Sequence, residues 1–306
     1  MMKFEKYPSI ENFYREKYIK EILMHYPEMM DKMYIITEKL HGSNTQLIFN
    51  PGAPMQVASR RSLITKGVHS HFNVWEVLEK YDIVLQGIQR LVDQHKNGIV
   101  FYSELFGPGI NKGINYGLEK QIRFFDARTQ LGWLTQKQLI EFCKRLGTSL
   151  FVPIIGYTQN LAEALAFETN FNSKIPNPEI EDNLCEGIVI KPFDHICVDW
   201  NGDLFYLKKK NEIFAESKPK KKNEIRAETR ELNEIFKTYI TDVRLQSVFS
   251  KEEYITNKSQ IGKYVRLLLE DAKEDFLKDY PDVKPEEHRK LFHVGDKAAR
   301  LIMRYL

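Results

Sequence analysis

The chain has 306 residues, of which 42% are hydrophobic and 28% charged, so it can form one large and one small domain with a buried core. No apolar stretch approaches the roughly 20 residues of a membrane-spanning helix, and residues 1–14 contain no apolar signal region. The three cysteines, Cys143, Cys185 and Cys197, are few, odd in number and without metal-ligand spacing. We therefore expect a soluble intracellular, cytoplasmic protein that has no membrane partner.

Positive charge is concentrated in one short region. The net charge is only +3, which does not identify a polyanionic partner by itself. However, Lys208, Lys209 and Lys210 are followed by a second group of lysines between positions 218 and 222. A solvated run of charge is the ordinary explanation for such a cluster, and phosphate binding is the functional one. The surroundings of Lys208 and Lys210 have to decide between them.

In the first two-thirds of the chain, β-rich runs alternate with fewer helical segments. Apolar residues spaced three or four apart predict one helix over residues 74–94, Thr135 can cap a helix that ends before Gly147, and residues 161–167 form a shorter candidate. Strands are expected at residues 33–37, 45–49, 56–60, 99–106, 121–126, 186–191 and 204–209.

The pattern of residue types changes beyond Lys222. Residues 224–239, 258–278 and 285–305 are charged, amphipathic and almost free of β signals, which predicts helices. The stretch Lys218–Lys222 forms a polar linker between the β-rich part and the helical part of the chain. The sequence therefore predicts an α+β fold with a sheet-containing domain at residues 1–222 and a small all-helical C-terminal domain at residues 223–306.

Lys39 has an unusual setting for a lysine. It follows a β run and begins a tight turn, so its side chain is expected to project from a strand end into a cleft. Lys208 and Lys210 are two residues apart on a predicted strand and therefore share a face. If that face points toward Lys39, three ammonium groups converge where a triphosphate can bind. Neighbouring cationic groups also favour a lysine that acts as a nucleophile.

The segment Lys39-Leu40-His41-Gly42-Ser43-Asn44 resembles the Lys-x-His-Gly-x-Asn signature of covalent nucleotidyltransferases, which include RNA ligases, DNA ligases and mRNA capping enzymes. Further matches follow in the order of the family's motifs. They are Arg60 (with Arg61 as the alternative), Glu104 before Leu105-Phe106-Gly107, Phe125 before Asp126, the strand Glu186-Gly187-Ile188-Val189-Ile190-Lys191, and Lys208 with Lys210.

The resemblance implies a role for each matched residue. Lys39 becomes covalently linked to AMP, and Lys208 and Lys210 hold the α-phosphate. Arg60 and Glu104 contact the ribose, Phe125 stacks on adenine, and Glu186 binds Mg²⁺ (or Mn²⁺) through water. Glu38, Leu40 and Asn44 complete the predicted nucleotide site.

Ordinary structural roles remain open for several of these residues. Glu104 could be a strand-end carboxylate, and Phe125 a core side chain. Glu186 and Lys191 could flank an unremarkable buried strand. Coincidence of all the motifs in the right order is much less probable than a shared mechanism.

Within this superfamily the chain is most similar to the RNA ligase 2 family of the T4 phage type. The similarity is carried by Phe4–Asn12, by residues 107–117 and by residues 208–211 with the lysine-rich linker that follows. It implies that residues 1–222 are a nucleotidyltransferase domain with mixed or antiparallel sheets and that residues 223–306 clamp nucleic acid. The implied activity is an ATP-dependent RNA ligase that joins a 5′-phosphate to a 3′-hydroxyl of RNA at nicks in duplexes, acting as a monomer.

Two alternatives remain. A DNA ligase or a capping enzyme of the same superfamily is expected to carry an OB-fold after the last lysine motif, whereas this tail is predicted to be helical. A non-catalytic RNA-binding protein on the ligase fold is the other alternative. The presence of Lys39, Glu104, Glu186, Lys208 and Lys210 argues against it, because the loss of any one is expected to stop the chemistry.

Overall fold

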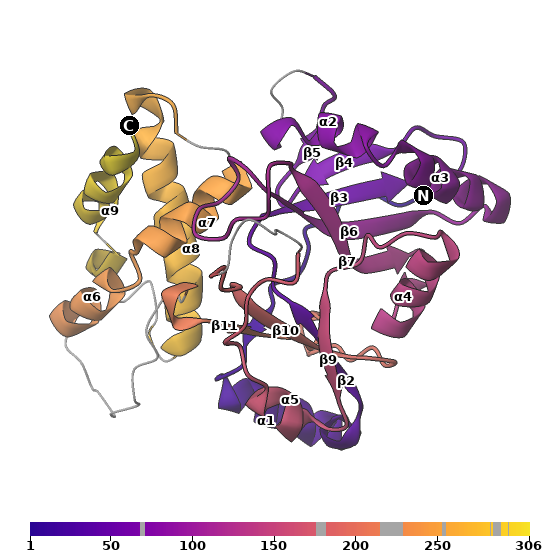
Figure 1. The fold of residues 1–306 in the computed structure, drawn as a ribbon. Helices are drawn as coiled ribbons and strands as arrows, with labels where there is room; N and C mark the ends of the chain where they lie inside the picture. Colours follow the sequence, from indigo (N-terminus) through magenta and orange to yellow (C-terminus); the bar gives the residue numbers. More distant parts are fainter. Residues whose placement is uncertain are drawn as a thin grey trace. The chain divides into compact units, whose positions relative to one another are not determined.

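The computed structural model describes two compact units, Met1–Asn211 and Glu212–Leu306 (Figure 1). The expected boundary after residue 222 and the lysines of the linker Lys218–Lys222 lie outside the described residues. Those described are residues 1–67, 71–175, 182–214, 229–252, 255–281, 283, 289–292 and 294–306.

The first unit contains two sheets (Figure 1). One has five strands in the order β1 (Glu11–Asn12), β11 (Leu207–Lys210), β10 (Gly187–Pro192), β2 (Tyr34–Glu38) and β9 (Ile154–Thr158). In this sheet β1 runs parallel to β11, and all other pairs are antiparallel. The second sheet is antiparallel, with the order β5 (Leu63–Ile64), β4 (Gln56–Ser59), β3 (Ser43–Phe49), β6 (Ile99–Phe106), β7 (Gln121–Thr129) and β8 (Gly132–Trp133).

Helices bury one face of each sheet against its own core. The five-stranded sheet packs against α1 (Glu16–His25) and α5 (Leu161–Ala166), whose Ile22 and Leu161 meet Ile36 and Ile188. The six-stranded sheet packs against α2 (Val74–Glu79), α3 (Asp82–His95) and α4 (Gln136–Arg145). The remaining turns of the first unit are the 3₁₀ segments Pro27–Asp31 and His71–Asn73.

The single helix predicted over residues 74–94 is wrong, because two helices occupy that region. α2 ends at Glu79 and α3 begins at Asp82, an acidic residue that favours the first turn of a helix. The buried residues keep their helical spacing on both sides of the break, which explains the error. Periodicity reports which face is buried, and it does not report whether the helix is continuous.

The helix predicted after Thr135 is confirmed. The Thr135 hydroxyl accepts from the backbone N–H of Gln138 at 3.2 Å, and the Gln138 side chain accepts from the backbone N–H of Thr135 at 2.9 Å. This reciprocal pair satisfies two backbone groups that a helix start leaves open.

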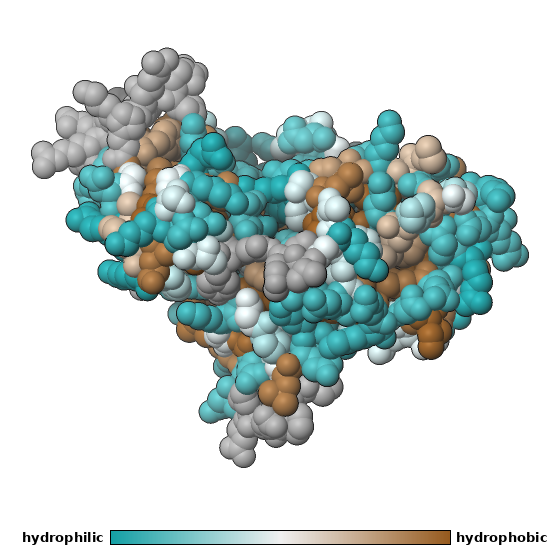
Figure 2. Space-filling view, turned by 90° about the horizontal axis from the view of Figure 1, so that it is seen from above, coloured by the Kyte–Doolittle hydropathy of each residue, from teal (hydrophilic) through white to brown (hydrophobic). Residues whose placement is uncertain are grey.

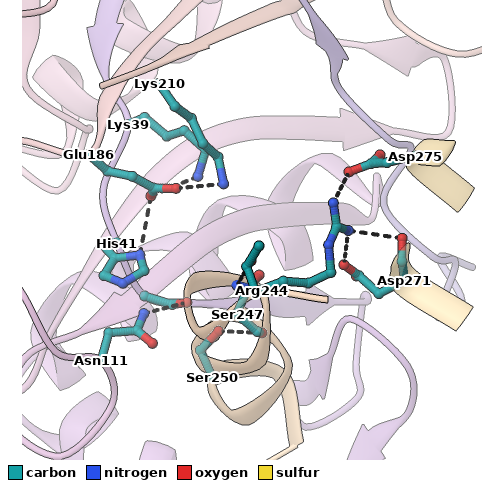
Figure 3. A network of polar contacts seen from close by, with 12 residues as sticks. Lys39, His41, Asn111, Glu186, Lys210, Arg244, Ser247, Ser250, Asp271 and Asp275 are labelled. Carbon is teal, nitrogen blue, oxygen red and sulfur yellow. Dashed lines mark hydrogen bonds and ion pairs between the residues drawn. The ribbon is translucent and has the colours of Figure 1, made fainter. Parts of the chain in front are cut away.

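The second unit is helical in its described residues, with a hydrophobic core of its own that includes Phe236, Phe249 and Phe276. Inside this unit Arg244 is fully buried and pairs with Asp271 at 2.6 Å and Asp275 at 2.9 Å (Figure 3). Its helices are α6 (Thr229–Lys237), α7 (Asp242–Glu252), α8 (Ile261–Asp279) and α9 (Gly295–Ile302), with 3₁₀ segments Glu212–Phe214, Lys258–Gln260, Arg289–Phe292 and Met303–Tyr305.

The predicted fold class, α+β with mixed and antiparallel sheets and C-terminal helices, is confirmed. Strands predicted from the sequence recur within a few residues of their expected bounds, and the short strands β1, β5 and β8 and the edge strand β9 were not predicted. On the face of the surface drawn in Figure 2, hydrophobic residues lie as separate patches among hydrophilic ones. Within the described ranges, no helix combines the length and the apolar character that crossing a bilayer demands.

Candidate active site

The turn that contains Lys39 connects the two sheets of the first unit. β2 ends at Glu38 in the five-stranded sheet, and β3 begins at Ser43 in the six-stranded one. The backbone N–H of Lys39 donates to the carbonyl of Gly187 at 2.9 Å, which fixes the turn to the start of β10. A Cβ atom at Gly42 would lie 2.3 Å from the carbonyl oxygen of Leu105, so only glycine fits there.

Glu186 is the centre of a polar cluster built from three segments (Figure 3). Its carboxylate accepts from Nζ of Lys39 at 2.8 Å and lies 3.1 Å from Nζ of Lys210 and 3.4 Å from Nδ1 of His41. Lys210 pairs with Gly187 in the sheet, which places it beside Glu186. Residues that are far apart in the sequence therefore meet around one carboxylate.

The charges of this cluster favour an ionised Glu186. Burial by itself disfavours the charged form, but Lys39, Lys210 and His41 outweigh it and hold the pKa of Glu186 well below its usual value. The sequence predicts that Lys208 and Lys210 lie on a face that points toward Lys39 and that Glu186 belongs to the same site. In the structure the carboxylate of Glu186 lies between Lys39 and Lys210.

Lys208 and Lys210 share one face of β11, as the alternation of a strand requires. Lys209, between them, points to the opposite side, where its Nζ donates to the carbonyls of Leu165 at 3.2 Å and Phe167 at 2.8 Å. Lys208 pairs with Val189 of β10 in the register that puts Lys210 opposite Gly187. Two of the three consecutive lysines thus lie on the face that carries Glu186.

Glu104 and Asn44 are direct partners on β6 and β3. Removal from solvent raises the pKa of Glu104 to about 8. The charge of Lys39 opposes this rise, and the charge of Glu186 adds to it. Oδ1 of Asn44 is buried and has no hydrogen-bond partner among the described residues. A buried oxygen without a partner costs about 1 to 3 kcal/mol, so a bound ligand with a donor would stabilise this arrangement.

Arg60 lies directly after β4, and its Nη2 donates to the hydroxyl of Ser9 at 3.2 Å. Its positive charge acts on Glu104 and opposes the rise in that group's pKa. Arg61 is exposed, with its backbone N–H bonded to the Ser59 hydroxyl at 3.2 Å. The charge of Arg60 thus acts on Glu104.

Phe125 occupies a β-bulge. Tyr102 pairs with Asp126 and Ser103 pairs with Phe124, so Phe125 is the extra residue of β7. Phe124 is fully buried in the core, whereas Phe125 is half-buried on the other face, with its ring 5.1 Å from that of Tyr7. The bulge therefore turns the ring of Phe125 away from the core that contains Phe124 and packs it against a second hydrophobic cluster, which includes Tyr7 and Tyr102.

Lys191 is fully buried and contacts the backbone of Phe125. Its Nζ donates to the carbonyl of Phe125 at 2.6 Å and pairs with Asp126 at 3.1 Å. Burial lowers the pKa of Lys191, and Asp126 opposes that change. Asp126 also accepts from Gln136 at 2.6 Å, from Tyr206 at 3.2 Å and from Tyr7. The sequence did not point to Tyr7, Gln136 or Tyr206, because nothing local marks a residue whose partner lies in another element.

The remaining predicted residues contribute in different ways. Glu38 is buried, and its carboxylate accepts from the Ser173 hydroxyl at 2.6 Å and the backbone N–H of Lys174 at 2.7 Å. Burial raises the pKa of Glu38. Leu40 is also buried, so its side chain serves packing while its backbone belongs to the turn. Neither side chain joins the charge cluster around Glu186.

Within the described part of the chain, no three His, Cys, Asp or Glu side chains lie close enough together to hold a metal ion by themselves. Glu186 is the carboxylate that the cluster places among the lysines. This donor set suits a hydrated Mg²⁺, which keeps several waters and commonly uses one or two carboxylates plus substrate phosphates.

Two family models match the chain. A model described as RNA ligase matches residues 32–210, and one described as T4 RNA ligase 2 C-terminal matches residues 222–300. The first match contains the turn of Lys39, Glu104, Phe125, Glu186 and the lysines of β11. The second falls on the helical unit.

Solved structures of a Naegleria gruberi RNA ligase are similar in fold. A mutant without ligand matches with a TM-score of 0.51 at 17% identity, covering 70% of this chain and 57% of that one. A Lys-to-Met mutant with AMP and Mn matches with a TM-score of 0.53 at 17% identity, covering 70% of this chain and 58% of that one. This chain therefore spans less than two thirds of those relatives, and the likeness concerns the fold.

Proposed function

The chain belongs to the RNA ligase family, and from that premise we propose that it is an ATP-dependent RNA ligase with Lys39 as its nucleophile. The observation that carries this proposal is the carboxylate of Glu186 shared by Lys39, Lys210 and His41. It supports a reaction that begins with an amine attacking a phosphate at the junction of the two sheets.

In the first step, Nζ of Lys39 forms a bond to the α-phosphorus of ATP, and the bond from that phosphorus to the pyrophosphate oxygen breaks. The attacking amine gives up its protons to water. Glu186, 2.8 Å from Nζ of Lys39, stays ionised and orients the amine. Lys208 and Lys210 offset the negative charge on the α-phosphate oxygens. Lys39 then carries AMP through a phosphoramidate bond.

The nucleoside of ATP is held by groups around the same turn. Glu104 and Arg60 fix the ribose, and the buried Oδ1 of Asn44 accepts a ligand hydrogen bond. The ring of Phe125 stacks on adenine, which contributes about 1 to 3 kcal/mol. Glu38 and Leu40 flank Lys39 in the sequence, and their buried side chains hold the turn in place. Together they keep the α-phosphate in line with the nucleophile.

A divalent cation completes the site. Mg²⁺ or Mn²⁺, held near Glu186 through water, supplies charge neutralisation for the triphosphate when it is bound. Forms of the Naegleria gruberi RNA ligase with ATP and Mn, and with AMP and Mn, support the same pair of ligands for this chain. The single carboxylate at the cluster is consistent with binding through water.

In the later steps AMP passes from Lys39 to the 5′-phosphate of an RNA strand, and a 3′-hydroxyl attacks that end, forms the phosphodiester and expels AMP. We assign adenylyl transfer to residues 1–222 and RNA clamping to residues 223–306. The match of residues 222–300 to the C-terminal part of T4 RNA ligase 2 supports this division. The proposed substrate is a nick in duplex RNA, and the proposed acting form is a monomer.

The test is the sealing of matched nicked duplexes that carry ribose or deoxyribose at the 3′-hydroxyl end. Wild type and Lys39→Ala are compared, with Lys20→Ala as a control because Lys20 is an exposed residue of α1. Sealing that needs ATP, Lys39 and a 3′ ribose is expected. Equal sealing of all-DNA nicks would instead indicate a DNA ligase, and the absence of any covalent AMP would indicate a non-catalytic RNA-binding protein.

A second experiment tests the division of labour. A fragment that ends at residue 222 should still form lysyl-AMP weakly but should not seal 5′-phosphate ends. Full sealing by that fragment would contradict the clamp role of residues 223–306.

A further inference from the structure

A segment outside the nucleotide motifs contacts the turn of residues 39–42 between β2 and β3, which we call the nucleophile turn. It extends from Gly107 to Gly117, between β6 and β7, and four of its residues are buried: Gly107, Ile110, Ile114 and Tyr116. Its start is fixed in place, because Gly107 has a φ of 124° and a Cβ there would lie 2.7 Å from the carbonyl oxygen of Glu119.

Two side chains of this segment bind the backbone of the nucleophile turn. The hydroxyl of Tyr116 accepts from the backbone N–H of His41 at 2.8 Å. Nδ2 of Asn111 donates to the carbonyl of Gly42 at 3.1 Å (Figure 3). Two consecutive residues of the turn, directly after Leu40, are thus held by one neighbouring segment.

The same segment is tied to the chain that leads into Glu186. Asn183 accepts from the backbone N–H of Asn115 at 2.9 Å and donates to the carbonyl of Asn115 at 2.7 Å. Asn183 lies three residues before Glu186 and is itself buried. A reciprocal pair of this kind fixes both the position and the orientation of the two backbones.

We propose that Tyr116 is a positioning residue for the nucleophile, and that residues 107–117 form a brace that sets Lys39 against Glu186. The brace holds the turn through Tyr116 and Asn111, and it holds the approach to Glu186 through Asn183. The distance between Lys39 and Glu186 depends on both anchors. This inference rests on the proposed role of Lys39.

Burial restricts the movement of the Tyr116 hydroxyl that accepts from the backbone N–H of His41. The ring is 3% exposed and packs edge to face against Phe106 at 4.8 Å, so the hydroxyl has little freedom to move away from the turn. Burial also raises the pKa of Tyr116 well above its usual value, and the hydroxyl stays neutral. Without that oxygen, the backbone N–H of His41 loses its partner and the turn can shift.

The test is single-turnover formation of lysyl-AMP by the full chain carrying Tyr116→Phe. We expect a fall in the rate constant at saturating ATP of about 10- to 100-fold, the size that a misplaced reacting group produces, with the KM for ATP nearly unchanged. The matched control is Tyr34→Phe, because the Tyr34 hydroxyl is also buried but donates to the carbonyl of Met29 at 2.7 Å. Tyr34→Phe is expected to change thermal stability and not the rate constant.

Asn111→Ala provides a second variant that removes the other contact to the turn without altering the buried ring. It is expected to lower the same rate constant to a smaller extent. Unchanged rate constants in both variants, or equal losses in Tyr116→Phe and Tyr34→Phe, would overturn the positioning role. Failure of wild type itself to form lysyl-AMP would instead overturn the proposed function, so the two failures are distinguishable.

Discussion

Nζ of Lys39 lies 2.8 Å from Oε2 of Glu186, although 147 residues separate them in the sequence. The contact joins the turn between the two sheets to the start of β10. A buried carboxylate that is also paired with Lys210 cannot be protonated easily, so the cluster is charged before a substrate arrives. This charged cluster is the feature on which the account of catalysis depends.

Replacing Glu186 by Gln should reduce the rate of lysyl-AMP formation by about 100-fold or more, because it removes the charge that orients Lys39 and Lys210. Single-turnover adenylylation measures this effect. Glu141→Gln is a suitable control, since Glu141 is exposed on α4. A rate within twofold of wild type would contradict the role of Glu186.

The same substitution has a signature in stability. Because the pKa of Glu186 is lower in the folded state than in the unfolded chain, its contribution to stability is present above the unfolded value near 4.5 and is lost as the pH falls below it. The difference in unfolding free energy between wild type and Glu186→Gln should therefore shrink as the pH is lowered from 6 toward 3. Urea unfolding at several pH values measures it, and a difference that grows in acid would contradict the assignment.

The contribution of Glu104 to stability should depend on pH in the opposite direction. Its pKa is raised to about 8 from an ordinary value of 4.5, so the folded state keeps a proton that the unfolded chain has lost. Wild-type stability due to this group is therefore lost progressively between pH 4.5 and 8. Glu104→Gln cannot titrate, so its stability relative to wild type should rise over that range and level off above it. A relative stability that is flat with pH would contradict the shifted pKa.

Lys191→Met should destabilise the protein by about 3 to 5 kcal/mol, since it leaves the buried Asp126 without its cation. It also removes the donor to the carbonyl of Phe125, so the KM for ATP should rise. Thermal unfolding and ATP-dependent adenylylation measure the two effects. Lys137→Met, at an exposed position of α4, is the control and should leave both nearly unchanged.

Arg244 allows a prediction about the helical unit alone. Arg244→Met removes a buried cation from Asp271 and Asp275 and should destabilise that unit by about 3 to 5 kcal/mol. Formation of lysyl-AMP should persist, because the variant leaves the adenylyl-transfer residues intact, whereas nick sealing should fall. Arg304→Met, at an exposed position, is the control. Undiminished sealing after loss of helical stability would contradict the clamp role.

Much of the candidate site could be anticipated because its residues stand in short motifs. Lys39 with its glycine turn and Glu186 before Gly187 are marked by local patterns, and strand alternation places Lys208 and Lys210 on one face. The bulge at Phe125 left no local signal, because a bulge is defined by the register of the partner strand.

The resemblance includes residues 107–117, and hence Tyr116, but the contacts of the supporting residues could not be anticipated for a similar reason. Tyr116 and Asn183 gain their roles from backbone atoms 75 and 68 residues away. Such contacts depend on how the elements pack, and no periodicity or spacing in the sequence encodes them. The break between α2 and α3 could not be anticipated either, because the apolar residues keep their helical spacing across it.

The most direct test of the central claim is to incubate the protein with ATP and Mg²⁺ and to locate any covalent AMP by intact mass and peptide mapping. The account predicts one AMP per chain on Lys39, its absence in Lys39→Ala, and its strong reduction in Glu186→Gln. An adduct on another residue, or none in wild type, would contradict it.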